Sequence, residues 1–169
     1  MKNSSFLRVY GDTDFVTGLR AIAATMVVVI HTGAFLGLGF LGEAMTSVGK
    51  YGVDIFFVIS GFTIAKTFGE AQSYKSYLTR RLMRIAPLYI LLISLALLAI
   101  SGGIIDPTYW MNRFGSGPDF YNWFMHLSFL SFLDYRIANS VLGVEWSIPI
   151  EVFWYVAVPF LLVLSRTGK

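Results

Sequence analysis

Long apolar runs dominate the chain and alternate with short polar segments. Residues 21–42 contain a single ionisable side chain, His31, and residues 85–105 contain no Asp, Glu, His, Lys or Arg. Each run is long enough to cross a hydrocarbon core of about 30 Å, which takes about 20 helical residues. The pattern therefore predicts membrane-spanning helices instead of a water-soluble fold.

The hydropathy pattern predicts four spans and one ambiguous segment. A shorter apolar stretch between Asp119 and Asp134 fits either a short span or a helix that lies in the membrane interface. The sequence therefore predicts an all-α, polytopic transmembrane helix bundle of about four to five spans, in a single membrane domain over residues 1–169. The four clearer spans cover residues 18–38, 51–68, 84–102 and 146–165.

Composition narrows the class of protein. The 169 residues are 56% hydrophobic and 14% charged, whereas about a quarter of the residues in a soluble domain are charged. Cysteine is absent and there are two histidines, which excludes disulfides and thiolate catalysis and leaves little scope for a metal site. Dense Lys/Arg clusters are missing despite the net charge of +3, so we expect the lipid bilayer, and no nucleic acid, as a partner.

Basic residues predict the orientation of the spans. The connection from Lys66 to Arg84 carries five basic residues and one acid, so the positive-inside rule places it in the cytoplasm together with the N-terminus. The connections at residues 39–50 and 103–119, which carry few basic residues, are expected on the opposite side. The first apolar run is longer than the core of a signal peptide, and we expect it to remain as an uncleaved span. If the ambiguous segment also spans, the C-terminus lies outside.

Two ionisable residues mark one stripe of the first predicted helix. A charge at the centre of a span costs about 2.5–3.5 kcal/mol even on lenient insertion scales, so such residues need a compensating role. His31 is predicted to lie in mid-span, and Arg20 lies 11 residues earlier, about three turns away and on nearly the same face. Two structural alternatives remain open, a helix–helix hydrogen bond for His31 and a snorkelling anchor for Arg20.

The last predicted span carries a carboxylate, Glu151, which shares a helix face with Tyr155. A carboxylate in a span requires a cation or a hydrogen-bond donor. Either a structural ion pair or a role in orienting or charging a histidine would satisfy Glu151.

The span at residues 51–68 has features that favour structural roles. Asp54 falls in its first turn, where a negative charge suits the helix dipole. Ser60 and Gly61 are small and would permit close approach of another helix.

Three arginines stand at the cytoplasmic entry of the next span. Arg80 and Arg84 share a face, with Arg81 beside them, and guanidinium groups suit phosphate oxygens. Membrane anchoring is the alternative interpretation. His126 is expected near an interface among aromatic residues and is given no chemical role.

Four sequence blocks together resemble the acyltransferase 3 family of multi-pass bacterial membrane enzymes, which acylate sugars of polysaccharides and related envelope or exported molecules. The first block holds the family's signature of an arginine, ten residues and a histidine, as Arg20 and His31. The matches extend over about residues 18–165. The blocks are GLRAIAATMVVVIH (18–31), GVDIFFVISGF (52–62), RRLMRIAPLY (80–89) and WSIPIEVFWY (146–155).

The chain departs from the family pattern in two ways. Thr17 stands where the family usually has an aspartate close to the signature arginine. Family members also usually run to about twice this length with roughly ten spans, so the resemblance implies the N-terminal half of a larger bundle. We expect the chain alone to be inactive, and a C-terminal half or a homo-oligomer to supply the missing helices.

The resemblance implies a reaction and roles for the marked residues. The reaction would move an acyl group, most often acetyl, from cytoplasmic acyl-CoA to a hydroxyl of a sugar or polysaccharide precursor at the bacterial cytoplasmic membrane, with no permanently bound cofactor. His31 would be the general base, with Arg20 as its signature partner near the entrance for the donor. Glu151 would orient or charge a neighbouring group such as His31.

The same resemblance assigns the basic block to the donor. Arg80, Arg81 and Arg84 would hold the phosphates of CoA on the cytoplasmic side. Other classes of function stay open, because a non-catalytic membrane subunit or remnant would carry the same blocks. A small transporter or proton-relay fragment is a further alternative, since His31 and Glu151 would also suit a relay.

Overall fold

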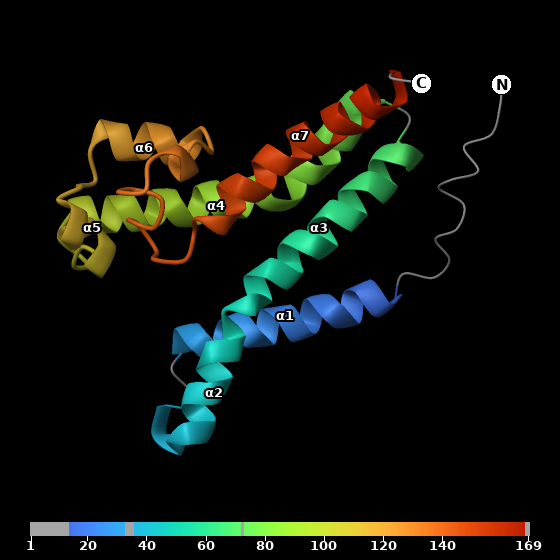
Figure 1. Ribbon diagram of the computed structural model, residues 1–169. Helices are drawn as coiled ribbons and strands as arrows, with labels where there is room; N and C mark the ends of the chain where they lie inside the picture. The colour runs from blue at the N-terminus through green and yellow to red at the C-terminus, as the bar shows by residue number, and fades with distance from the viewer. Residues whose placement is uncertain (1–13, 33–35, 72, 168–169) are drawn as a thin grey trace. The chain divides into compact units, whose positions relative to one another are not determined.

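The computed structural model describes residues 14–32, 36–71 and 73–167, and these residues form helices and turns without a strand (Figure 1). The predicted all-α class is therefore confirmed. The chain divides into two compact units, Met1–Glu70 and Ala71–Lys169.

The first unit is built from α1 (Asp14–Thr32), α2 (Phe40–Gly49) and α3 (Tyr51–Glu70), with a 3-10 turn, η2, at Leu36–Leu38. In Figure 1, α1 lies against α3 and α2, and α2 leads almost directly into α3. The predicted boundaries 18–38 are wrong for the first helix, and the predicted connection at 39–50 is mostly helical. A glycine-rich sequence explains the break in the apolar run, because Gly39 has φ of 55°, a left-handed conformation that favours glycine.

Glycines set the distance between α1 and the helices that follow it. A Cβ atom added to Gly52 would lie 2.8 Å from the Ala23 carbonyl oxygen and 3.0 Å from the Met26 Cβ, so α3 packs there backbone against backbone. Gly49 likewise lies directly against Ile30. The expected close approach of a helix at Gly61 is not present within the described part of the first unit, where a Cβ there would meet no atom within 4 Å. Gly52, the first residue of the GVDIFFVISGF block, is therefore a packing residue that allows α3 to approach α1 closely.

The second unit is built around the long helix α4, which runs from Tyr74 to Ser101. It begins ten residues before the predicted boundary, because the Ser73 hydroxyl accepts a hydrogen bond from the Ser76 amide and caps a polar first turn that hydropathy does not register. In Figure 1, α7 lies along the N-terminal half of α4 and α6 along its C-terminal half. The other elements are α5 (Tyr109–Phe114), α6 (Phe120–Leu127), the 3-10 turn η3 (Ser131–Leu133) and α7 (Ser147–Thr167).

The ambiguous segment does not form a span. Helix α6 has eight residues, which at 1.5 Å per residue is about 12 Å and far short of a bilayer core. Within the described residues, four segments are long and apolar enough to cross a membrane: Phe15–Thr32, Phe40–Gly69, Tyr74–Ser101 and Ser147–Ser165. Because the segment at α6 is too short to span, the condition under which the C-terminus was expected outside is not met. Four spans, an even number, would place both ends on one side of the membrane, and that orientation stays a prediction.

Candidate functional site

His31 lies in the last turn of α1 and is exposed. The expectation that it lies in mid-helix is wrong, because α1 ends at Thr32 although the apolar sequence continues beyond it. Hydropathy alone does not register where a helix ends inside an apolar run. The imidazole is therefore at an end of the first span, and Arg20 lies about three turns back toward the other end.

One ring nitrogen of His31 is engaged by the backbone. Nδ1 lies 2.7 Å from the carbonyl oxygen of Val27, and since a carbonyl oxygen only accepts, Nδ1 carries the proton of this hydrogen bond. In the neutral imidazole, Nε2 then holds the lone pair. The local helix thus selects the tautomer in which Nε2 can accept a proton.

Arg20 connects α1 to α3. Its Nη2 donates to the Thr63 hydroxyl at 3.1 Å, and this hydroxyl in turn donates to the carbonyl oxygen of Ser60 at 3.0 Å. The guanidinium is partly buried by this contact. The contact therefore holds the charged side chain of Arg20, a signature residue, against α3.

The three arginines of α4 have different surroundings. Arg81 is 8% exposed, and its guanidinium carbon lies 5.6 Å from the centroid of the Tyr155 ring on α7. Arg80 and Arg84 are exposed. A guanidinium over an aromatic face is attracted by the ring quadrupole, so Arg81 takes part in the packing of α4 against α7. The two exposed arginines remain accessible to an anionic ligand.

Glu151 obtains its hydrogen-bond donor from its own helix. The Tyr155 hydroxyl donates to Oε1 of Glu151 at 2.7 Å, and the Tyr155 ring is 1% exposed. The structure thus brings together Arg81, Tyr155 and Glu151, two of which were predicted site residues. The suggested pairing of Glu151 with His31 stays a prediction, because the two residues belong to different compact units.

Sequence reasoning missed a buried polar network around His126, whose side chain is fully buried. Nε2 donates to the carbonyl oxygen of Ile137 at 3.1 Å, and Nδ1 accepts from the Tyr89 hydroxyl at 3.0 Å. Burial lowers the pKa of His126 to about 4, so the imidazole is neutral at pH 7. The aromatic surroundings expected for His126 are present in Tyr89, while its depth in the membrane stays a prediction. Its ring holds the loop at Ile137 against α4.

Glu145 completes this network at the start of the last helix. Its carboxylate accepts from the backbone amides of Val141, Leu142 and Val144 at 2.7, 3.1 and 3.0 Å, and it lies 4.0 Å from Nε2 of His126. Burial raises the pKa of Glu145. Glu145 folds the chain into the tight loop that introduces the WSIPIE block. The position of this glutamate directly before the block could have drawn attention to it in the sequence. A local sequence pattern, however, does not show that a side chain is buried.

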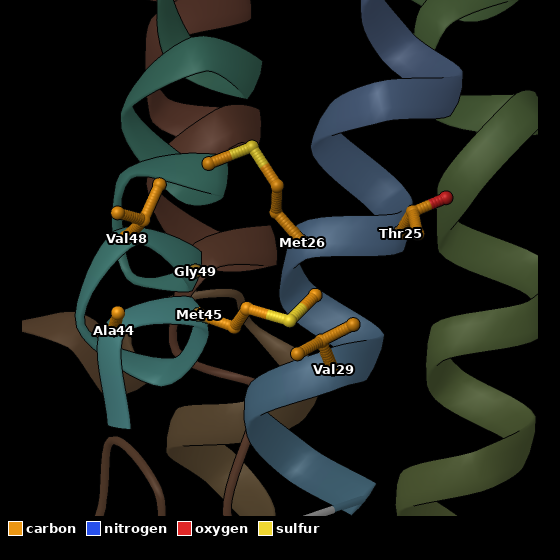
Figure 2. A pocket seen from close by; sticks show the side chains of 7 residues that line it. All are labelled: Thr25, Met26, Val29, Ala44, Met45, Val48 and Gly49. Carbon is orange, nitrogen blue, oxygen red and sulfur yellow. The ribbon is translucent and has the colours of Figure 1, made fainter. Parts of the chain in front are cut away.

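An apolar cavity of about 340 Å³ lies between α1 and α2. In Figure 2, Met26 from α1 and Met45 from α2 extend toward the opposite helix. Met26 and Val29 are about 140° and 160° around α1 from His31, so this cavity is on a different face of the helix from the imidazole. It has no charged side chain and suits apolar groups only. The lining residues are Thr25, Met26, Val29, Ala44, Met45, Val48 and Gly49.

Metal-ligating side chains are not gathered in the described residues, where no group of three or more His, Asp or Glu could hold a metal ion. The marked residues supply an exposed imidazole, exposed guanidinium groups and a carboxylate that accepts a hydrogen bond from a tyrosine.

Comparisons with known proteins agree with the sequence blocks. The family model described as an acyltransferase domain matches residues 13–169. The chain is 29% identical over 166 residues to the peptidoglycan O-acetyltransferase OatA of Listeria monocytogenes, a match that covers 91% of this chain and 25% of that protein. It is 27% identical over 166 residues to nodulation protein 10 of Rhizobium leguminosarum, covering 89% of this chain and 44% of that protein. No solved structure matches the chain.

Proposed function

The chain belongs to the acyltransferase 3 family, and on that basis we propose that it is part of a membrane-bound enzyme that transfers an acyl group to a hydroxyl of a saccharide. It spans less than half the length of either relative described above. The name of the Listeria relative supports a cell-wall glycan as acceptor and acetyl as the acyl group. The enzyme would lie in the bacterial cytoplasmic membrane, with its N-terminus in the cytoplasm.

The proposal rests on the exposure and the tautomer of the His31 imidazole. An exposed imidazole with Nδ1–H fixed on the Val27 carbonyl presents Nε2 as a base. In the proposed reaction, Nε2 takes the proton of the sugar hydroxyl while the hydroxyl oxygen attacks the thioester carbon of acyl-CoA. The carbon–sulfur bond then breaks, and the imidazolium returns the proton to the departing CoA thiolate. The products are an O-acyl sugar and CoA.

The donor is assigned to the exposed arginines. Arg80 and Arg84 are accessible cations next to the connection that the positive-inside rule places in the cytoplasm, where acyl-CoA is found. Each would form charge-assisted hydrogen bonds with CoA phosphates. Arg81, which packs on Tyr155, would instead stabilise the contact between α4 and α7.

Further helices are proposed to complete the site. General-base catalysis requires the acceptor hydroxyl within about 2.6–3.2 Å of the base and works best where water is excluded. His31 is exposed in this chain, so its described surroundings do not exclude water. We expect the 169-residue chain to gain activity when a partner or a second copy covers this face.

Replacement of His31 tests the assigned base. The chain would be reconstituted in vesicles with acetyl-CoA and a panel of sugars, alone and together with the C-terminal remainder of a relative's acyltransferase domain. In the complemented form, His31→Ala should lower kcat by about 10²–10⁴-fold, whereas Thr32→Ala in the same helical turn should leave it nearly unchanged. Activity that persists in His31→Ala would refute the base. Robust transfer by the chain alone would refute the need for further helices.

The donor site has a separate test. Arg84→Gln should weaken equilibrium binding of acetyl-CoA by about 1.5–3 kcal/mol, the range for a hydrogen bond to a charged group. Lys75→Gln is the matched control, since it removes one exposed positive charge from the same helix outside the arginine block. If both variants weaken binding equally, the arginines act only through general electrostatic attraction and the assigned phosphate site is wrong.

A further inference from the structure

The connection between α4 and α7 contains a polar cavity of about 150 Å³. It lies outside the four segments that are apolar enough to span a membrane. Side chains at the end of α5, at the start of α6 and in the turn after η3 line it, among them Tyr121, Asp134 and Arg136. The distribution of basic residues places this connection on the side opposite the cytoplasm, where an exported glycan is found.

The two charges at the centre of the cavity neutralise each other. Arg136 donates to Asp134 through Nε at 3.0 Å and through Nη2 at 2.7 Å. The Tyr121 hydroxyl also donates to Asp134, at 3.2 Å. Asp119, the other carboxylate of the cavity, accepts from the Asn122 amide at 2.9 Å and caps α6. Since the single cation already has a carboxylate partner, the cavity lacks the surplus positive charge that a phosphate ligand needs.

Hydrogen-bonding capacity remains in the cavity beside this charge pair. The Ser116 hydroxyl is buried and has no hydrogen-bond partner among the described residues. The second terminal amine of Arg136, Nη1, forms no hydrogen bond within the described part of the chain, and the side chain is 57% exposed. Since the Ser116 oxygen is enclosed, the donor that a ligand can reach is the exposed guanidinium of Arg136. An N–H donor beside the lone pairs of a tyrosine hydroxyl suits a vicinal diol, whose hydroxyl groups both donate and accept.

Aromatic rings border the same polar groups. Tyr121 is 46% and Tyr135 is 74% exposed, and the Tyr135 ring stands edge-on to Phe114 with centroids 5.4 Å apart. A pyranose ring has an apolar C–H face and a hydroxyl edge, so it pairs an aromatic face with hydrogen-bonding side chains. At about 150 Å³ the cavity is far too small for CoA and leaves room for no more than one sugar ring.

We propose that this cavity is a binding subsite for one uncharged sugar ring of the acceptor glycan, held through Tyr121 and Arg136. The proposal rests on the proposed function, since it assigns a place to the saccharide that this function requires. It makes Tyr121 and Arg136 residues that govern acceptor affinity, and it gives them no part in the transfer chemistry.

Binding of a neutral oligosaccharide, without any acyl donor, tests the subsite. The full chain in nanodiscs of phosphatidylcholine would be titrated with the tetramer of N-acetylglucosamine, and binding followed by saturation-transfer NMR. Tyr121→Phe, which keeps the ring and removes only the hydroxyl, and Arg136→Gln should each raise Kd by about two- to tenfold. The matched controls Tyr109→Phe and Arg113→Gln, both exposed on α5 and outside the cavity, should leave Kd unchanged.

Salt and competing ligands separate the sugar from a lipid headgroup. Binding of an uncharged tetramer should be insensitive to salt up to about 0.5 M, whereas phosphate recognition would be screened. Binding of glycerol phosphate that displaces the sugar and weakens with salt would overturn the proposal in favour of a headgroup site. Equal Kd values for all four variants, or no saturable binding by the native chain, would also overturn it.

The same variants distinguish failure of the subsite from failure of the proposed function. If the complemented enzyme transfers acyl groups and Tyr121→Phe leaves the KM for the acceptor unchanged, the subsite is refuted and the proposed function is supported. If the variants change sugar binding as expected but the complemented enzyme transfers no acyl group, the proposed function is refuted and the subsite is supported.

Discussion

Acidification should destabilise the second unit through His126. Burial among Tyr89 and Ile137 lowers the pKa of this imidazole from 6.5 to about 4. Above pH 6.5 the imidazole is neutral in both states, and the native state has its full stability. As the pH falls from 6.5 toward 4, the unfolded chain binds a proton that the native state does not, so stability is lost. At pH 5 the loss is about 1.5 pH units times 1.36 kcal/mol, or about 2 kcal/mol.

Hydrogen exchange of the α6 amides in detergent micelles measures this loss. Protection would be compared at pH 7.5 and pH 5 after correction for intrinsic exchange rates. His126→Gln is the control variant, because glutamine keeps an N–H donor for the Ile137 carbonyl and does not titrate. Amides of α1, in the other unit, serve as an internal control.

Glu145 contributes to the pH dependence of the native chain's stability with a sign opposite to that of His126. Its pKa is raised by burial, so the folded state keeps a proton that the unfolded chain releases above pH 4.5, and stability falls as the pH rises. The quantity that tests the prediction is therefore the stability of the native chain minus the stability of the His126→Gln variant at each pH. That difference should fall by about 2 kcal/mol between pH 7.5 and pH 5. A constant difference would refute a neutral buried imidazole, and a rising one would indicate an ion pair with Glu145.

Two further predictions concern packing and topology. Gly52→Ala should destabilise the contact of α1 with α3 by about 1–3 kcal/mol, because the new methyl group meets the Ala23 backbone, whereas Gly61→Ala on the same helix should be neutral in thermal unfolding. Single cysteines at positions Ser73 and Lys169 should react with an impermeant reagent from one side of the membrane and a cysteine at Asp106 from the other. Labelling of Ser73 and Asp106 from the same side would contradict α4 as a span.

The sequence by itself determined the properties that depend on neighbouring residues along the chain. Apolar runs longer than a bilayer core predicted membrane spans, and the matching blocks identified the family. The 11-residue spacing of Arg20 and His31 likewise placed the two on one helical stripe, since the helix repeat is local. The tautomer of His31 is also a local matter, because its partner Val27 is one turn away.

The tertiary structure decided which face of each helix is covered and where the apolar runs break. Hydropathy averages over a window, so it did not show that α1 ends one residue after His31 or that the segment at α6 is too short to span. Arg81 and Arg84 are alike in sequence, yet one packs on a ring from α7 and the other is exposed. His126 and Glu145 are buried because segments distant in sequence fold over them. Burial depends on the partner surface, which a local sequence pattern does not contain.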